Sequence, residues 1–121
     1  MITAYAYPYI QMQAEQFFRA LSDPTRLQCL QMLAAERELC VCEIVHVLAL
    51  SQPKVSRHLA QLRDQGIVDT ERRGQWIYYR LNKALPAWTL DVLEAARRAE
   101  SLDPLRQRLT QMPNRPTVAC D

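Results

Sequence analysis

Long apolar runs are missing from this 121-residue sequence. No stretch approaches the ~20 apolar residues that a membrane-spanning helix needs. The opening residues MITAYAYPYI lack the basic start and small-residue cleavage site of a secretory signal. We therefore expect a cytoplasmic protein without a membrane partner, in which the four cysteines stay reduced. In such a chain an even number of thiols favours ligation or reactivity over disulfides.

Glycine is also scarce: Gly66 and Gly74 are the only two, and so few turns favour helices. The sequence has no Cys-x-x-Cys pair, no glycine-rich phosphate loop and no second histidine placed to activate a thiol. These absences argue against a thiol enzyme, and we predict that the chain is not an enzyme. A metal carrier without DNA function would leave the basic segments described next unexplained.

The apolar residues recur at helical spacing in five segments, and two further segments have the β-branched and aromatic content of strands. In chain order these are helices over 11–21, 24–35, 40–48 and 51–66, strands over 67–72 and 75–81, and a last helix from Pro86 that continues past Asp103-Pro104 with or without a break. Two helices joined by a short turn and followed by a hairpin form a winged helix-turn-helix. We predict a mainly α fold with a two-stranded β-wing, in one domain over 1–112, with a flexible C-terminal tail over 113–121.

The helix over 51–66 has the pattern of a DNA-reading helix. Val55, Leu59 and Leu62 form a narrow apolar stripe, and basic and amide side chains occupy the opposite side. Arg, Lys, Gln and Ser donate to base edges and phosphates in the major groove, and a basic wing contacts the backbone or minor groove. A solvated face on an ordinary amphipathic helix is the alternative. The predicted contacts to double-stranded DNA are Ser51, Gln52, Lys54, Ser56, Arg57, Gln61, Arg72, Arg73 and Gln75.

Cys40 and Cys42 lie where the third helix begins, and thiolates are soft ligands that prefer soft, thiophilic ions. The start of a helix lowers the pKa of a thiol and favours the thiolate. Residues i and i+2 are about 200° apart on a regular helix. The two side chains should therefore point nearly apart, and they can bind one small centre only if the first turn unwinds. Because this helix packs against the reading helix, unwinding would shift the reader. Oxidation of either thiol is an alternative switch.

Three separated motifs, ELCVCEI (38–44), LSQPKVSRHLAQLRDQGIV (50–68) and ERRGQWIYYRL (71–81), occur together with SDPTRLQCLQML (22–33). In their order and spacing they resemble the ArsR/SmtB family of metal-responsive repressors. The resemblance implies a homodimer built on the first and last helices, which represses a resistance operon by binding operator DNA. It also implies that the Cys-Val-Cys marks an arsenite-responsive or a cadmium/lead-responsive branch.

The arsenite branch usually carries a third cysteine at the position of Val45. The candidate third ligand here is Cys120, within or across subunits, with Cys29 the alternative, although Cys29 suits a buried apolar role. A site of two thiols would suit a methyl or phenyl arsenical. Residues 1–28 lack the cysteines that the cadmium/lead branch usually adds, and the last helix lacks histidines for zinc. The resemblance therefore implies arsenite as inducer, without separating it from antimonite.

Overall fold

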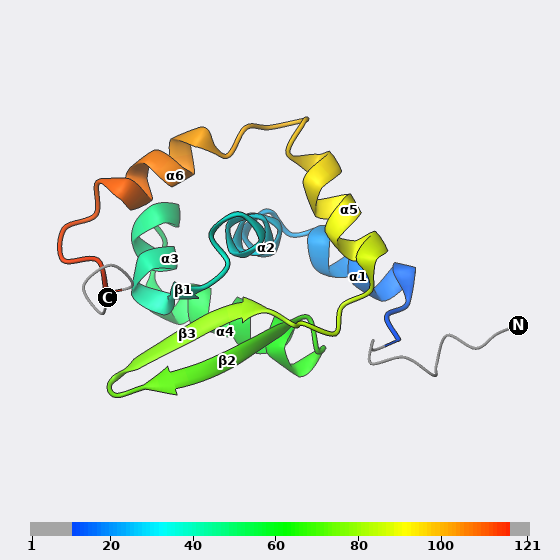
Figure 1. Ribbon diagram of the computed structural model, residues 1–121, viewed down its shortest axis with the longest axis horizontal. Helices are drawn as coiled ribbons and strands as arrows, with labels where there is room; N and C mark the ends of the chain where they lie inside the picture. The colour runs from blue at the N-terminus through cyan, green and yellow to red at the C-terminus, as the bar shows by residue number, and fades with distance from the viewer. Residues whose placement is uncertain (1–10, 117–121) are drawn as a thin grey trace, which may run out of the picture.

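Helices surround a small antiparallel sheet in the computed structural model, which describes residues 11–116 (Figure 1). The central helix α2 has α1 and α5 on one side and α3 and α6 on the other, and the sheet lies below it (Figure 1). None of the described helices is both long and apolar enough to cross a bilayer. The elements are α1 (Ala14–Leu21), α2 (Pro24–Glu36), β1 (Leu39–Cys40), α3 (Val41–Leu48), α4 (Gln52–Asp64), β2 (Val68–Arg73), β3 (Trp76–Leu81), α5 (Ala87–Ala96) and α6 (Asp103–Thr110).

Side-chain caps fix the start of α2 and of α4, the helix predicted to read DNA. The Asp23 carboxylate accepts a hydrogen bond from the backbone N–H of Arg26 at 3.0 Å, and Pro24 follows it in the first turn of α2. The Ser51 hydroxyl accepts from the backbone N–H of Lys54 at 3.3 Å at the start of α4. Both caps satisfy N–H groups that the helix itself leaves unpaired. These two helix starts confirm the sequence prediction.

The predicted apolar stripe of α4 is buried in the core. Val55, Leu59 and Leu62 are each 0% exposed. They join one hydrophobic cluster with α2, which contributes Leu30 and Leu33. The stripe therefore anchors α4 along one edge and leaves its opposite side in solvent, as expected for an amphipathic helix.

The β2–β3 hairpin confirms the predicted two-stranded wing, and a third strand, β1, was not predicted. The strand order is β1–β3–β2, all antiparallel. Strand β1 is only two residues long, with Leu39 opposite Tyr79 and Cys40 opposite Tyr78. A two-residue strand carries no alternation that a pattern could reveal. Its pairing joins the segment just before α3 to the base of the wing.

The C-terminal part departs from the sequence expectation at the predicted tail. The last helix has the break that the sequence left open, with α5 ending at Ala96 and α6 beginning at Asp103. The predicted tail begins at Pro113, yet Arg115 lies against α3, where its Nε donates to the Glu43 carboxylate at 2.5 Å. An ion pair to a buried carboxylate holds this point of the chain, so the packed region extends through the last described residues.

Candidate functional site

The outward face of α4 carries most of the predicted DNA contacts. Ser51, Gln52, Lys54, Arg57 and Gln61 are exposed, and only Ser56 is half-buried. The Gln61 side-chain oxygen accepts from Arg26 of α2 at 3.4 Å, which ties this amide to the helix behind it. The remaining donors project from one rigid, capped helix. Such a row can follow base edges and phosphates in a major groove.

The wing turn presents Arg72 and Gln75 to solvent. Gly74 adopts φ +61° at this turn, a backbone conformation that glycine reaches without steric cost. The Arg72 guanidinium donates to the Gly74 carbonyl at 3.2 Å, which holds this side chain at the tip. The turn therefore offers one positive charge and one amide beside the reading helix.

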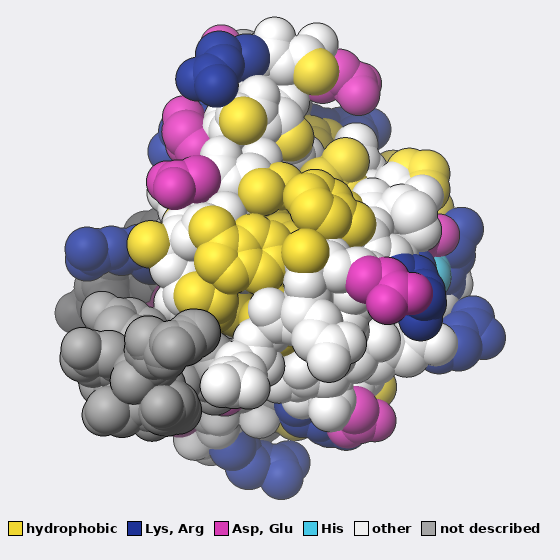
Figure 2. Space-filling model, turned by 90° about the vertical axis from the view of Figure 1, so that its right-hand side faces the viewer, with side chains coloured by type: hydrophobic (Ala, Val, Ile, Leu, Met, Phe, Trp, Pro, Cys, Tyr) yellow, Lys and Arg dark blue, Asp and Glu magenta, His cyan; other side chains and the backbone are white. Residues whose placement is uncertain are grey.

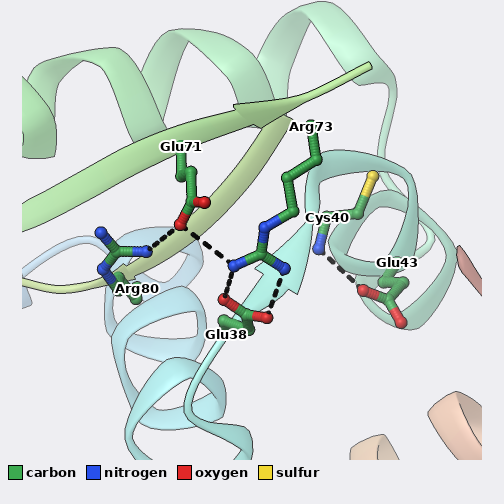
Figure 3. Close-up of polar contacts among 6 residues, drawn as sticks. All are labelled: Glu38, Cys40, Glu43, Glu71, Arg73 and Arg80. Atoms are coloured by element: carbon green, nitrogen blue, oxygen red, sulfur yellow. Dashed lines mark hydrogen bonds and ion pairs between the residues drawn. The ribbon is translucent and has the colours of Figure 1, made fainter. Parts of the chain in front are cut away.

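Arg73, also predicted to contact DNA, forms ion pairs with residues of its own domain (Figure 3). Its guanidinium donates to both carboxylate oxygens of Glu38, at 2.7 and 2.8 Å, and to Glu71 at 3.1 Å. It also lies 4.5 Å from the centre of the Tyr78 ring. Glu71 accepts in turn from Arg80 at 2.9 Å, and these two cations, Arg73 first, hold the pKa of Glu71 at about 2. Arg73 thus ties the wing to the segment that leads into Cys40.

The two thiols of the Cys-Val-Cys motif are in contact. The Sγ atoms of Cys40 and Cys42 are 3.0 Å apart. The predicted divergence of these side chains was wrong, because Cys40 is the N-cap residue of α3, with extended backbone at φ −76° and ψ 152°. The about 200° separation applies only when both residues lie on the helix. The pair is therefore already assembled without unwinding α3.

A thiol pair at this distance fits one shared centre. With bonds of about 2.3 Å, the length of a zinc–thiolate bond, two sulfurs on one atom lie roughly 3.3–3.8 Å apart for angles of about 90–110°. The sulfurs need to separate by less than about 1 Å from their present contact, and a small side-chain rotation suffices for that. The pair can thus supply two sulfur ligands to a soft centre.

The pKa of Cys42 also differs from the expectation. Burial, followed by the hydrogen bond to Cys40 and the charge of Glu43, raises the pKa of Cys42 to about 12. Desolvation therefore outweighs the field at the start of the helix, and the expected thiolate was wrong for Cys42. A ligand that carries hydroxyl groups suits such a pair. Each hydroxyl takes up one thiol proton and leaves as water when the sulfur binds.

Glu43 supports this geometry and was missed as a site residue. Its side chain is fully buried, and one carboxylate oxygen accepts from the backbone N–H of Cys40 at 2.7 Å (Figure 3). The other oxygen accepts from Arg115 at 2.5 Å. The Glu three residues after the N-cap is the second half of a capping box. This spacing is readable in the sequence once Cys40 is taken as the cap.

The thiols open into a pocket that they share with residues of the predicted DNA-reading surface. The pocket has a volume of about 280 Å³ and lies between the start of α3, the start of α4 and the wing. A molecule bound to the sulfurs thus meets side chains of the reader and the wing directly. The pocket is lined by Cys40, Val41, Cys42, Gln52, Ser56, Gln75, Trp76, Ile77 and Tyr79.

The other cysteines lie apart from this pair or beyond the described residues. Cys29 is 0% exposed in the core, where burial raises its pKa to about 12, in keeping with the small apolar role expected of it. Cys120 lies outside the described residues. Within residues 11–116, no group of three or more His, Cys, Asp or Glu side chains could hold a metal ion. The described part of the site is thus a two-thiol site.

Comparisons with known proteins find similar bacterial regulators. A family model described as "Bacterial regulatory protein, arsR family" matches residues 23–70. The chain is 50% identical over 107 residues to the arsenic resistance transcriptional regulator ArsR1 of Pseudomonas putida, with 85% of this chain and 84% of that protein covered. It is 44% identical over 85 residues to the arsenical resistance operon repressor of Escherichia coli, with 70% and 73% covered. Reduced HlyU from Vibrio cholerae has a similar structure, with a TM-score of 0.62, 34% identity, and 69% of this chain and 84% of that chain covered.

Proposed function

The chain belongs to the arsR family of bacterial regulatory proteins, and from this premise we propose that it is an arsenite-sensing transcriptional repressor. It binds operator DNA as a homodimer and leaves it when arsenite binds Cys40 and Cys42. The single observation that carries this proposal is the contact of the two sulfurs at 3.0 Å in a pocket bounded by the reading helix and the wing.

The DNA contacts follow from the side of α4 that the core leaves free. The helix enters the major groove with Lys54 and Arg57 on base edges or phosphates, and the wing places Arg72 on the backbone or minor groove. Ser51, Gln52, Ser56, Gln61 and Gln75 complete the interface as polar contacts, and Arg73 keeps the wing in position while it is bound to Glu38.

Release follows from the shared pocket and needs no unwinding of α3. A ligand on the two sulfurs occupies space beside Gln52 and Ser56 of the reader and Gln75 of the wing. The arrangement of these side chains that binds DNA then competes with the arrangement that accommodates the ligand on the sulfurs. This competition couples DNA binding to ligand binding. The coupling is reciprocal, and typical values weaken DNA binding by about 5–150-fold.

Inorganic arsenite takes a third sulfur in this proposal, and Cys120 is the candidate. Arg115, bound to Glu43 beside Cys40, brings the chain to the thiol pair five residues before Cys120. An extended segment of that length reaches about 17 Å. The buried position of Cys29 in α2 makes it the weaker candidate.

The dimer that we propose uses the side of the molecule formed by α1 and α5. Phe18 is 51% exposed and Leu90 is 45% exposed, which is unusual for side chains of this size. Phe18 also packs on Trp88 across the two helices, with ring centres 6.4 Å apart. Figure 2 shows hydrophobic side chains gathered on this face. Covering such a patch with a second copy removes it from water.

The test is a gel-shift titration on the DNA directly upstream of the gene, with arsenite, cadmium and zinc compared. We expect arsenite to release the DNA while cadmium and zinc leave the complex intact. Release by cadmium at equal or lower concentration would contradict the arsenite assignment and favour a cadmium/lead-responsive repressor. Failure to shift the DNA in any condition would contradict the repressor itself.

A thiol-redox-responsive repressor is the second candidate, because the sulfur contact of 3.0 Å also favours a disulfide between Cys40 and Cys42. Peroxide would oxidise the two thiols, forming the S–S bond while both protons and both peroxide oxygens leave as water. Release by peroxide in the absence of arsenite would support this candidate, and retention of the complex would exclude it.

A further inference from the structure

The three strands of the sheet align one residue each in a row that starts at the thiol site. Cys40 of β1 lies opposite Tyr78 of β3, and Tyr78 lies opposite Glu71 of β2. Strand β2 ends at Arg73, at the wing turn. The backbone pairing of the sheet therefore connects one of the two thiol residues to the strand that leads to the tip of the wing.

The Arg73 side chain connects the same two segments a second time (Figure 3). Its guanidinium lies 4.5 Å from the centre of the Tyr78 ring and donates to Glu71 at 3.1 Å. It also donates to both carboxylate oxygens of Glu38, at 2.7 and 2.8 Å. Glu38 directly precedes β1 and lies two residues before Cys40. Arg73 thus bridges the end of β2 to the segment that enters the thiol site.

This contact is better suited to fixing positions than to stabilising the fold. The side chains of Arg73 and Glu38 are 41% and 27% exposed, and isolated ion pairs at such exposure contribute little to stability. The two parallel hydrogen bonds, however, fix the direction as well as the distance between the two groups. Glu71 also accepts from Arg80 at 2.9 Å, so the pair belongs to a network of charges.

The Glu38–Arg73 pair lies where binding at the sulfurs causes a displacement. The Sγ atoms of Cys40 and Cys42 are 3.0 Å apart and have to separate before they can share one atom. Cys40 is 2% exposed and its partner in the sheet, Tyr78, is 1% exposed. Because buried side chains are closely packed, a shift of Cys40 presses on its neighbours instead of entering free space. The ring of Tyr78 and the guanidinium above it are in that direction.

We propose that the Glu38–Arg73 ion pair couples arsenic binding at Cys40 to the position of the wing. Arg73 acts as a positioning residue, which places the wing turn and its Arg72 for DNA through contacts that begin two residues from the thiol site. This inference rests on the proposed function, because it names how the same thiol site regulates DNA binding. Without the ion pair, a ligand on the sulfurs retains only its direct effect on the pocket beside α4.

The test compares release with arsenite binding in the full-length chain. Fluorescence anisotropy gives the operator affinity without arsenite and at saturating arsenite, and calorimetry gives the arsenite affinity of the chain without DNA. The ratio of the two operator affinities should be about 5–150 for the wild-type chain. Glu38→Gln and Arg73→Ala should each lower this ratio at least about threefold, while the arsenite affinity of the free chain stays unchanged. The double variant should match the single variants, because all three lack the same contact.

The matched control is Arg72→Ala on the neighbouring wing residue, whose guanidinium donates to the Gly74 carbonyl. It should weaken operator binding by the same factor in both conditions and leave the ratio unchanged, as expected for a phosphate contact. Glu38→Gln keeps the size of the side chain and should fold, which circular dichroism checks.

Three results would overturn the inference and leave the proposed function standing. They are a wild-type ratio in Glu38→Gln, an Arg73→Ala variant that behaves like Arg72→Ala, and a weaker arsenite affinity of the free Glu38→Gln chain. If arsenite does not release the wild-type chain from its operator, the proposed function itself fails, and this result differs from all three.

Discussion

The buried contact between Glu43 and Arg115 provides a quantitative test of how the thiol site is held. Glu43→Gln removes a carboxylate charge at a fully buried position, where its oxygens accept from Cys40 N–H and from Arg115. Removing one partner of a buried ion pair costs about 3–5 kcal/mol. Arg115 keeps a second carboxylate, Glu36, at 3.8 Å, which lowers the expected cost. We expect the free energy of unfolding to fall by about 2–3 kcal/mol.

A double-mutant cycle isolates the pair from general effects of the substitutions. Urea unfolding followed by circular dichroism, at one protomer concentration, gives the free energies for Glu43→Gln, for Arg115→Ala and for both changes together. Arg97→Ala is the control, because its pair with Glu94 is largely exposed and should contribute less than about 1 kcal/mol. We expect a coupling energy of about 1–2 kcal/mol between Glu43 and Arg115. Additive effects, within about 0.5 kcal/mol, would refute the role given to this contact.

Three further changes test the DNA and dimer surfaces. Arg57→Ala should weaken operator binding by about 1–3 kcal/mol in fluorescence anisotropy without altering arsenite affinity, and an unchanged DNA affinity would remove Arg57 from the interface. Operator affinity of the wild-type chain should fall steeply with salt because bound phosphates release counterions, so a flat response would contradict the basic wing and helix as a DNA surface. Phe18→Glu should shift the chain to monomer in analytical ultracentrifugation, because a charge on the apolar face opposes its burial, and an intact dimer would place the interface elsewhere.

The sequence predicted the parts of the fold that depend on local pattern. The stripe of Val55, Leu59 and Leu62 repeats at helical spacing, and the caps at Asp23 and Ser51 are local hydrogen bonds, so both can be read from neighbouring residues. The wing was predicted because two strand-like segments flank a glycine turn. The positions of α4, the proposed DNA-reading helix, and of the wing therefore followed from the sequence alone.

The remaining features depend on contacts between distant segments. Glu38 and Arg73 are 35 residues apart, and Glu43 and Arg115 are 72 apart, so no local pattern pairs them. The predicted direction of the Cys40 side chain was wrong for a more local reason. A boundary shift of one residue makes Cys40 the cap instead of the first helical residue, and such shifts are beyond pattern reading. That one residue decides whether the sulfurs diverge or touch.

The most direct measurement of the central claim is operator affinity by fluorescence anisotropy, without arsenite and at saturating arsenite. It is made for the wild-type chain and for the Cys40→Ser/Cys42→Ser variant. Because the thiol pair shares its pocket with the reading helix and the wing, the wild-type affinity should fall by about 5–150-fold, while the variant binds the operator equally well in both conditions. A wild-type protein shown by mass spectrometry to carry arsenic on its thiols, yet bound to the operator with undiminished affinity, would contradict the account.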